Sequence, residues 1–226
     1  MRENPGEAQS IPEAVLVCFA VKEEARYFIA ALGREDDRVR TLITGMGHAN
    51  ADLRLSMAVA ARRPAMVITS GFAGGLDPKL GVGQVVFEAD PDTGLAGRLI
   101  RVGGIEGNFY CAEHVAVTAA EKAELWKSTG ADAVEMESGV IRSLCRKANI
   151  PSATVRVISD TADQDLPLDF NALMTSEQRI SYVRLAWCVA TRPWKIPALK
   201  RLQKQTAAAA KNLGKVLAAA ILKAED

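Results

Sequence analysis

The chain has 226 residues, of which 49% are hydrophobic, and a formal net charge of +1. This length suits one domain with a sizeable core, and the nearly neutral charge gives no reason to expect nucleic-acid binding. We therefore expect a single domain over residues 13–226, after a flexible, polar lead over residues 1–12 that shows no signal-peptide pattern. No apolar run reaches the ~18 residues that would span a bilayer.

The cysteine pattern argues against both a disulfide framework and a metal site. The four cysteines are far apart and show no CxxC or Cys/His spacing: Cys18, Cys111, Cys145 and Cys188. We expect them to be reduced core residues of a cytoplasmic protein, and we expect neither a metal nor an organic cofactor.

Strand and helix patterns alternate in the first part of the chain. They predict strands at residues 14–20, 39–44 and 66–70, and helices at 22–32 and 49–62. The glycine-rich segment that follows, Gly71–Gly75, lies between this strand and a turn, and it would let the backbone approach a ligand closely.

The middle of the chain predicts a more antiparallel region. Strands are expected at 83–88, at 97–102 and, briefly, at 115–117, with a glycine-rich loop at 103–110. A helix at 119–129 follows, and Gly130 is expected to end it.

The last part begins with a strand–helix–strand unit over 131–160, whose helix covers residues 138–148. A loop at 164–169 and closing helices at 174–190 and 197–223 follow. Alternation of this kind predicts a mostly parallel sheet with helices on both faces.

Three carboxylates end the strands of this unit. Glu135 and Glu137 follow the first strand, and Asp160 follows the second. Ligands bind at the carboxyl edge of open α/β sheets, so these acids are candidates for chemistry. The plainer interpretations are that Asp160 caps a helix and that the two glutamates lie at an exposed strand end.

Other titratable residues are more ambiguous. Glu23 and Glu24 follow the first strand, where they could favour a helix start or activate a water. His48 and His114 have no Ser or Cys partner at a recognisable spacing, so both are interpreted as mainly structural, with His114 the better candidate to line a pocket.

Several motifs occur together and in order: FAVKEEA at 19–25, TGMG at 44–47, TSGFAGGLDPKLGVGQVV at 69–86, AVEMES at 133–138 and VRVISDTAD at 155–163. On these motifs the chain resembles the nucleoside phosphorylase superfamily, which includes methylthioadenosine/S-adenosylhomocysteine nucleosidases. The resemblance implies an α/β fold, a three-layer α/β/α sandwich with a mixed, partly barrel-like central sheet. It also implies a homodimer or larger homo-oligomer that cleaves the N-glycosidic bond of a purine nucleoside.

The resemblance also implies roles for individual residues. Asp160 matches the acid that protonates the base, and Glu24 matches the glutamate that activates water. The residues matched to substrate binding are Glu137 and Met136 at the ribose, with Glu135 beside them, Ser159 next to the acid, Ala73 and Gly74 near the anomeric carbon, Met46 near the 5′ group, Phe72 near the nucleophile, and Val115 in a base clamp near 114–117.

The nucleophile stays open at this stage. Phosphorolysis needs phosphate as co-substrate and cationic side chains to bind it. Thr69 stands where the phosphorylases have an arginine, which together with Glu24 favours hydrolysis. Against this, the short middle of the chain, the run at 121–138 and RPWKIPALKRL at 192–202 are similar to hopanoid-associated phosphorylases, which implies an adenosylated lipid substrate. A non-catalytic nucleoside-binding module is the alternative from another class.

The C-terminal segment is cationic. From Arg192 to Ala224 there are eight basic residues and no acidic ones. Its apolar stripe consists of Leu199, Leu202, Ala209, Leu213 and Val216, with lysines on both flanks. The stripe could pack on the core as a closing helix, or the helix could also contact an anionic membrane surface, which would make the protein membrane-peripheral.

Overall fold

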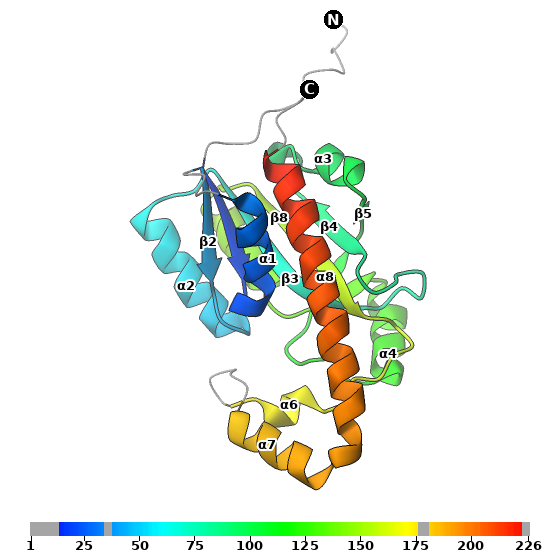
Figure 1. Ribbon diagram of the computed structural model, residues 1–226. Coiled ribbons are helices and arrows are strands. Elements are labelled where there is room, and N and C mark those ends of the chain that lie inside the picture. Colours follow the sequence, from blue (N-terminus) through cyan, green and yellow to red (C-terminus); the bar gives the residue numbers. More distant parts are fainter. Residues whose placement is uncertain (1–13, 34–37, 176–180, 223–226) are drawn as a thin grey trace, which may run out of the picture.

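The computed structural model describes residues 14–33, 38–175 and 181–222, so the predicted N-terminal lead lies outside the described residues. In the described part of the chain an eight-stranded mixed sheet forms the middle layer (Figure 1). Its main path runs β2-β1-β3-β8-β4-β5, and β7 branches from β3 and pairs with β6. The strands are β1 Val15–Phe19, β2 Val39–Ile43, β3 Met66–Gly75, β4 Val85–Ala89, β5 Gly104–Glu106, β6 Phe109–Cys111, β7 Ala133–Glu135 and β8 Ser152–Asp160.

Helices cover both faces of this sheet. The longer helices are α1 Lys22–Leu32, α2 His48–Ala61, α4 Ala119–Thr129, α5 Ser138–Lys147, α7 Tyr182–Thr191 and α8 Ile196–Leu222; the short ones are η1 Pro91–Thr93, α3 Ala96–Arg101, α6 Phe170–Leu173 and η2 Pro193–Lys195. One core cluster joins α1 and α8 to the sheet through Phe28 and Leu213, and another joins α2 and α5 through Leu55 and Ile141. The predicted α/β sandwich with a mixed central sheet is confirmed.

Helices α1 and α8 cross at very short range (Figure 1). A Cβ atom at Gly214 would lie 2.6 Å from the backbone carbon of Tyr27 and 2.7 Å from the nitrogen of Phe28. Only glycine fits such a contact, so this residue in α8 fixes how closely the last helix packs on the first.

The two longest strands, β3 and β8, pair in parallel along the centre of the sheet. Every residue of β8 is buried, as expected for a strand covered on both faces. The register shifts at Ala73 and Gly74, which places Gly74 opposite Asp160. The glycine-rich segment Gly71–Gly75 therefore belongs to β3, which is longer than the strand predicted at 66–70, because β8 continues to pair with β3 as far as Gly74.

The strand–helix–strand unit is present, but its two strands are not parallel neighbours. Strand β7 pairs antiparallel with the last residues of β3, whereas β8 runs parallel to β3. The expectation that Glu135 and Asp160 share the carboxyl edge of a parallel sheet is wrong for β7. The two acids still line one cavity, because Gly74 of β3 pairs with Val134, next to Glu135, on one side and with Asp160 on the other.

Two predictions for the middle of the chain are also wrong. Residues predicted as a strand at 97–102 form α3, where Leu95 and Leu99 are buried one helical turn apart. The predicted loop at 103–110 contains the short strands β5 and β6, because each finds a parallel partner, in β4 and in β7. These pairings depend on segments distant in sequence.

Two further segments differ from the predictions. No strand forms at 115–117, because the backbone of Val115 hydrogen-bonds to the side chain of Asn171 instead. The helix predicted at 174–190 begins later than expected: residues 174 and 175 are not helical, residues 176–180 lie outside the described residues, and α7 begins at Tyr182.

Helix α8 confirms the plainer interpretation of the C-terminal stripe. Ala209, Leu213 and Val216 are buried in the core cluster with α1 and the sheet. This part of the stripe is therefore unavailable to a membrane. Among the described helices, none combines the length and the apolar character needed to cross a bilayer.

Candidate functional site

A cavity of about 270 Å³ lies where β3, β7 and β8 end. Every residue predicted for the site lines it: Glu24, Met46, Phe72, Ala73, Gly74, Val115, Glu135, Met136, Glu137, Ser159 and Asp160. These residues come from segments far apart in the sequence, so their convergence is a property of the tertiary structure.

Glu24 lies in the first turn of α1 and points into the domain. It is buried, whereas its neighbour Glu23 is exposed. Its carboxylate accepts hydrogen bonds from the backbone N–H groups of Ala20 (3.1 Å), Val21 (3.2 Å) and Phe72 (3.0 Å). Burial nevertheless raises the pKa of Glu24 to about 7, and Arg156 only partly opposes this effect. A carboxylate with such a pKa is suited to exchange a proton near neutral pH.

Arg156, in the middle of β8, binds the two other glutamates. Its Nη2 lies 2.5 Å from Glu135 Oε2 and 3.3 Å from Glu137 Oε2, and the residue is almost fully buried. The same guanidinium donates to Thr69 Oγ1 at 3.1 Å and to the Ser70 carbonyl at 3.2 Å. Glu24, Glu135, Glu137 and Arg156 together form what we call the Arg156 cluster, in which three carboxyl groups surround one cation.

The two glutamates that Arg156 binds differ in their surroundings. Burial would raise the pKa of Glu135, but Arg156 and hydrogen bonds from Ser138 outweigh it, so the pKa lies below its usual value. Burial raises the pKa of Glu137, with Glu135 adding to the effect and Arg156 opposing it. Glu135 thus holds the start of α5 in place, whereas Glu137 has fewer protein partners and faces the cavity.

Asp160 ends β8 and is held on both carboxylate oxygens. The Ser159 hydroxyl donates to Oδ1 at 2.6 Å, and Lys122 Nζ from α4 forms an ion pair with Oδ2. Lys122 is fully buried and also donates to the carbonyls of Thr161 (2.9 Å) and Gln164 (2.8 Å). This Asp160–Lys122 pair fixes the carboxyl group at the cavity wall.

Two glycines of β3 allow these acids to come close to the strand. A Cβ atom at Gly71, where φ is +143°, would lie 2.6 Å from Glu24 Oε1. A Cβ atom at Gly74 would lie 3.2 Å from Val134 Cγ1 and 3.3 Å from Asp160 Oδ2. The glycine-rich stretch therefore serves close side-chain packing within a strand.

The remaining wall of the cavity is mostly apolar and comes from the second half of the chain. Asn171, in α6, hydrogen-bonds to both backbone groups of Val115: its Oδ1 accepts from the Val115 N–H and its Nδ2 donates to the Val115 carbonyl, both at 2.9 Å. Phe170 of α6 and Leu202 of α8 line the cavity, and so does His114, as the sequence suggested.

Among the described residues that line the cavity, none is Lys or Arg. Thr69, which the resemblance matches to the phosphorylase arginine, is buried and accepts a hydrogen bond from Arg156. The Arg156 guanidinium lies near the cavity without lining it, and its positive charge is already paired with the carboxylates of Glu135 and Glu137.

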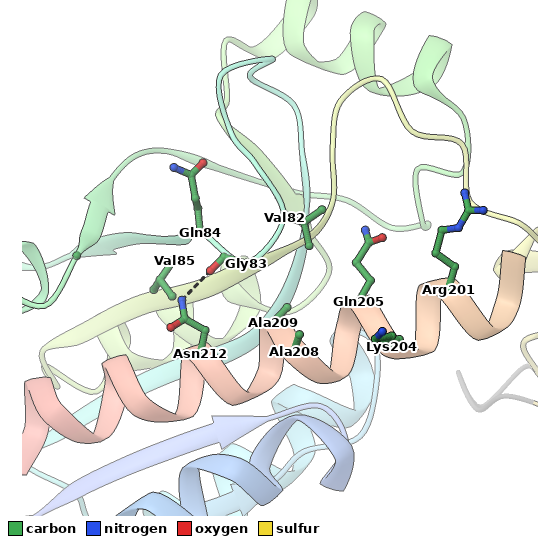
Figure 2. Close-up of a pocket in the computed structure, with 11 residues that line it drawn as sticks. Val82, Gly83, Gln84, Val85, Arg201, Lys204, Gln205, Ala208, Ala209 and Asn212 are labelled. Atoms are coloured by element: carbon green, nitrogen blue, oxygen red, sulfur yellow. Dashed lines mark hydrogen bonds between the residues drawn. The ribbon is translucent and has the colours of Figure 1, made fainter.

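A larger cavity of about 720 Å³ lies elsewhere, between α8 and the segment 82–85 (Figure 2). Arg201 and Lys204 project from α8 there, and the Asn212 side chain donates to the Gly83 carbonyl at 2.8 Å. No described residue lining this cavity is Asp or Glu. The smaller cavity is the candidate site because it alone of the two combines buried carboxyl groups with an apolar wall.

The sequence interpretation missed three residues that organise the site: Arg156, Lys122 and Asn171. Arg156 carried a signal, since an arginine in the middle of a run of β-branched residues must be paired when buried. Lys122 and Asn171 carried none, because their partners lie 38 and 56 residues away in the sequence.

The comparisons with known proteins agree with this geometry. The family model described as "Phosphorylase superfamily" matches residues 4–90 and 100–182. A 5′-methylthioadenosine/S-adenosylhomocysteine nucleosidase of Glaesserella parasuis serovar 5 (strain SH0165) is 27% identical over 169 residues, which cover 60% of this chain and 74% of that protein.

Solved structures show the same fold at lower identity. A 5′-methylthioadenosine/S-adenosylhomocysteine nucleosidase of Colwellia psychrerythraea, in complex with adenine, superposes with a TM-score of 0.67 at 15% identity, over 94% of this chain and 96% of that one. Futalosine hydrolase of Helicobacter pylori superposes with a TM-score of 0.64 at 17% identity, over 91% and 97%.

Proposed function

Since the chain belongs to the phosphorylase superfamily, we propose that it hydrolyses the N-glycosidic bond of an adenine nucleoside that carries an apolar 5′ substituent. The proposal is supported most by one observation: Asp160 and Glu24 line a single cavity whose described lining contains no Lys or Arg. The described lining thus supplies one carboxyl group for the proposed acid and one for the proposed base, and it contains no Lys or Arg that could bind phosphate.

In the proposed reaction, Asp160 gives a proton to N7 of the base while the bond between N9 and the anomeric carbon breaks. Lys122 and Ser159 stabilise the carboxylate that remains. Water attacks the anomeric carbon and gives a proton to Glu24, so the products are the free base and the 5′-substituted ribose. Glu137 accepts hydrogen bonds from the ribose hydroxyls, which favours the electron-poor transition state.

The apolar wall supports an apolar 5′ substituent. Met46, Phe170 and Leu202 line the cavity together with the carboxyl groups, so a nucleoside bound at the acids has apolar side chains beside it. The relative in Glaesserella parasuis is named for methylthioadenosine and S-adenosylhomocysteine, which are adenosines substituted at 5′. Methylthioadenosine is therefore the first substrate to test.

Phosphorolysis, which the resemblance to hopanoid-associated phosphorylases implies, is the second candidate. It would require the phosphate to bind beside Glu24, and the nearest guanidinium, Arg156, is already bound to Glu135 and Glu137. A non-catalytic nucleoside-binding module would need no Asp160. The homo-oligomer implied by the resemblance and the cytoplasmic location stay predictions.

The test is release of adenine from methylthioadenosine, and from an adenosine with a longer 5′-alkyl chain, measured with and without phosphate. Hydrolysis predicts release without phosphate and a free 5-substituted ribose. Release only with phosphate, giving a ribose 1-phosphate, would replace hydrolysis by phosphorolysis. Binding of both compounds without release under either condition would instead support the binding module.

A further inference from the structure

Large apolar side chains are exposed on α7 and η2, outside the candidate site. Val183, Trp187 and Trp194 are 80%, 72% and 69% exposed. Val183 and Trp187 are one helical turn apart, so they lie on the same face of α7. Figure 1 shows that α6 and α7 project beyond the sandwich, beside the first turns of α8. We call Val183, Trp187 and Trp194 with the cations next to them the α7–η2 surface.

The charge of this region has one sign. Between Ser181 and Leu222 the sequence has eight Arg or Lys residues and no Asp or Glu. Arg192 precedes η2, Lys195 ends it and Lys200 follows in α8, so all three cations are close in sequence to Trp194. By contrast, the exposed Leu53 and Met57 on α2 have both an acid and a base beside them.

We propose that the α7–η2 surface binds the surface of an anionic lipid bilayer. Tryptophan favours the headgroup level of a membrane, and each Lys or Arg near an anionic bilayer strengthens binding. A second copy of this chain is a poorer partner, because a twofold interface through this surface would bring the cations Arg192, Lys195 and Lys200 of both copies together. The part of the α8 stripe formed by Ala209, Leu213 and Val216 plays no part here, because it is buried.

The α7–η2 surface is connected to the candidate site by α8. Leu202 lines the cavity and lies roughly 9 Å along the helix axis from Ile196, the first residue of α8. Gln205 Nε2 donates to the Ser159 carbonyl at 2.8 Å, which ties α8 to the strand end that carries Asp160. Delivery of a lipid-linked nucleoside from the bilayer to the cavity rests on the proposed function, whereas bilayer binding does not.

The first experiment measures sedimentation of the full chain with phosphatidylcholine vesicles and with vesicles containing 30 mol% phosphatidylglycerol. We expect binding to the anionic vesicles, weakened at high salt. Trp187→Ala with Trp194→Ala should weaken binding at least tenfold. The matched control is Trp126→Ala, since Trp126 is 42% exposed but lies on α4, and it should bind like the wild type.

A second pair of variants tests the cations. Arg192→Gln, Lys195→Gln and Lys200→Gln together should weaken vesicle binding about a hundredfold, at roughly fivefold per charge. The control triple of Arg54→Gln, Lys127→Gln and Lys147→Gln removes the same charge from exposed positions elsewhere and should change binding less than fivefold.

Two results would overturn the proposal. One is equal or absent binding to both kinds of vesicle by the wild type. The other is a loss of oligomeric state in the tryptophan variant, seen by sedimentation velocity, without any vesicle binding by the wild type, which would make the surface a subunit interface. Adenine release from methylthioadenosine, measured on the same variants without vesicles, should be unchanged, so failure of bilayer binding and failure of the proposed function are distinguishable.

Discussion

The carboxyl groups of the Arg156 cluster and of the Asp160–Lys122 pair line the same cavity, but the two groups of residues balance buried charge differently. In the pair, one carboxylate meets one ammonium. In the cluster, one guanidinium serves three carboxyl groups, and burial keeps the pKa of Glu24 and Glu137 above their usual values. A balanced pair fixes a group in position, whereas an excess of carboxyl groups leaves protons that can move near neutral pH.

The largest effect on activity is expected when Asp160, the acid of the Asp160–Lys122 pair, is replaced. Asp160→Asn should lower kcat for adenine release by about 10³-fold or more, because the amide cannot protonate the leaving base. Circular dichroism should show that the fold is retained. Asp163→Asn, at an exposed aspartate three residues away, is the control and should keep nearly full activity. Equal activity in the two variants would remove Asp160 from the mechanism.

Replacing Arg156, the cation of the Arg156 cluster, should lower the stability of the protein. Arg156→Met leaves Glu24, Glu135 and Glu137 without their shared cation, and we expect the free energy of unfolding to fall by about 3–5 kcal/mol. Arg142→Met is the comparison, since Arg142 also binds two acids, but Glu88 and Asp90 are partly exposed, and the loss should be smaller. Denaturant unfolding measures both. Similar decreases in the free energy of unfolding for the two variants would mean that burial of the acids around Arg156 contributes little to the effect.

Glu24→Gln tests whether the excess carboxyl group is the base. We expect kcat/KM to fall about a hundredfold or more. In the wild type, kcat/KM should rise with pH through about 7, the pKa of Glu24, because the ionised form accepts the proton from water. This rise should vanish in the variant. A profile that stays unchanged in Glu24→Gln would assign the rise to another group.

The same substitution has a signature in stability. The folded pKa of Glu24 is about 7 and the ordinary value is 4.5, so the folded state holds a proton that the unfolded state loses between these values. Its contribution to the free energy of unfolding therefore falls as pH rises from about 4.5 to 7, by on the order of 3 kcal/mol. Between pH 4.5 and 7, the free energy of unfolding of the wild type should therefore decrease relative to that of Glu24→Gln by this amount, which denaturant unfolding at several pH values would measure.

Breaking the pair from its other side should have a smaller effect on rate. Lys122→Met leaves the Asp160 carboxylate with Ser159 as its side-chain partner. We expect kcat to fall about a hundredfold, because the charged donor that stabilises this carboxylate is lost. Lys122→Arg should restore part of the rate if the charge matters. The exposed Lys127→Met, on the same helix, is the control for loss of a lysine from α4.

The smallest effect on activity is expected from a substitution in β3 that reduces the space beside Asp160. Gly74→Ala places a methyl group 3.3 Å from Asp160 Oδ2, which should lower kcat/KM about threefold to tenfold by shifting the acid a few tenths of an ångström. Gly97→Ala is the matched control: its Cβ meets no atom within 4 Å in α3, so it should stabilise the protein by about 0.5–1 kcal/mol and leave activity unchanged.

The sequence by itself determined most elements and the candidate acids. Strand β1, helix α1 and helix α4 follow the predictions because their signals are local: a continuous apolar run, a helix-ending glycine at Gly33, and a capping box between Thr118 and Glu121. The motifs also identified the site residues, all of which line one cavity. Their catalytic roles stay predictions.

Only the tertiary structure decided how the charges at that cavity are paired. Arg156 meets Glu135, and Lys122 meets Asp160, across sheet and helix contacts that no periodicity in the sequence encodes. The same holds for the antiparallel direction of β7 and for the strands β5 and β6, which exist because distant segments offer a partner. Local propensity determines where a helix or strand forms, whereas long-range packing determines which buried side chains pair with one another and share a proton or a charge.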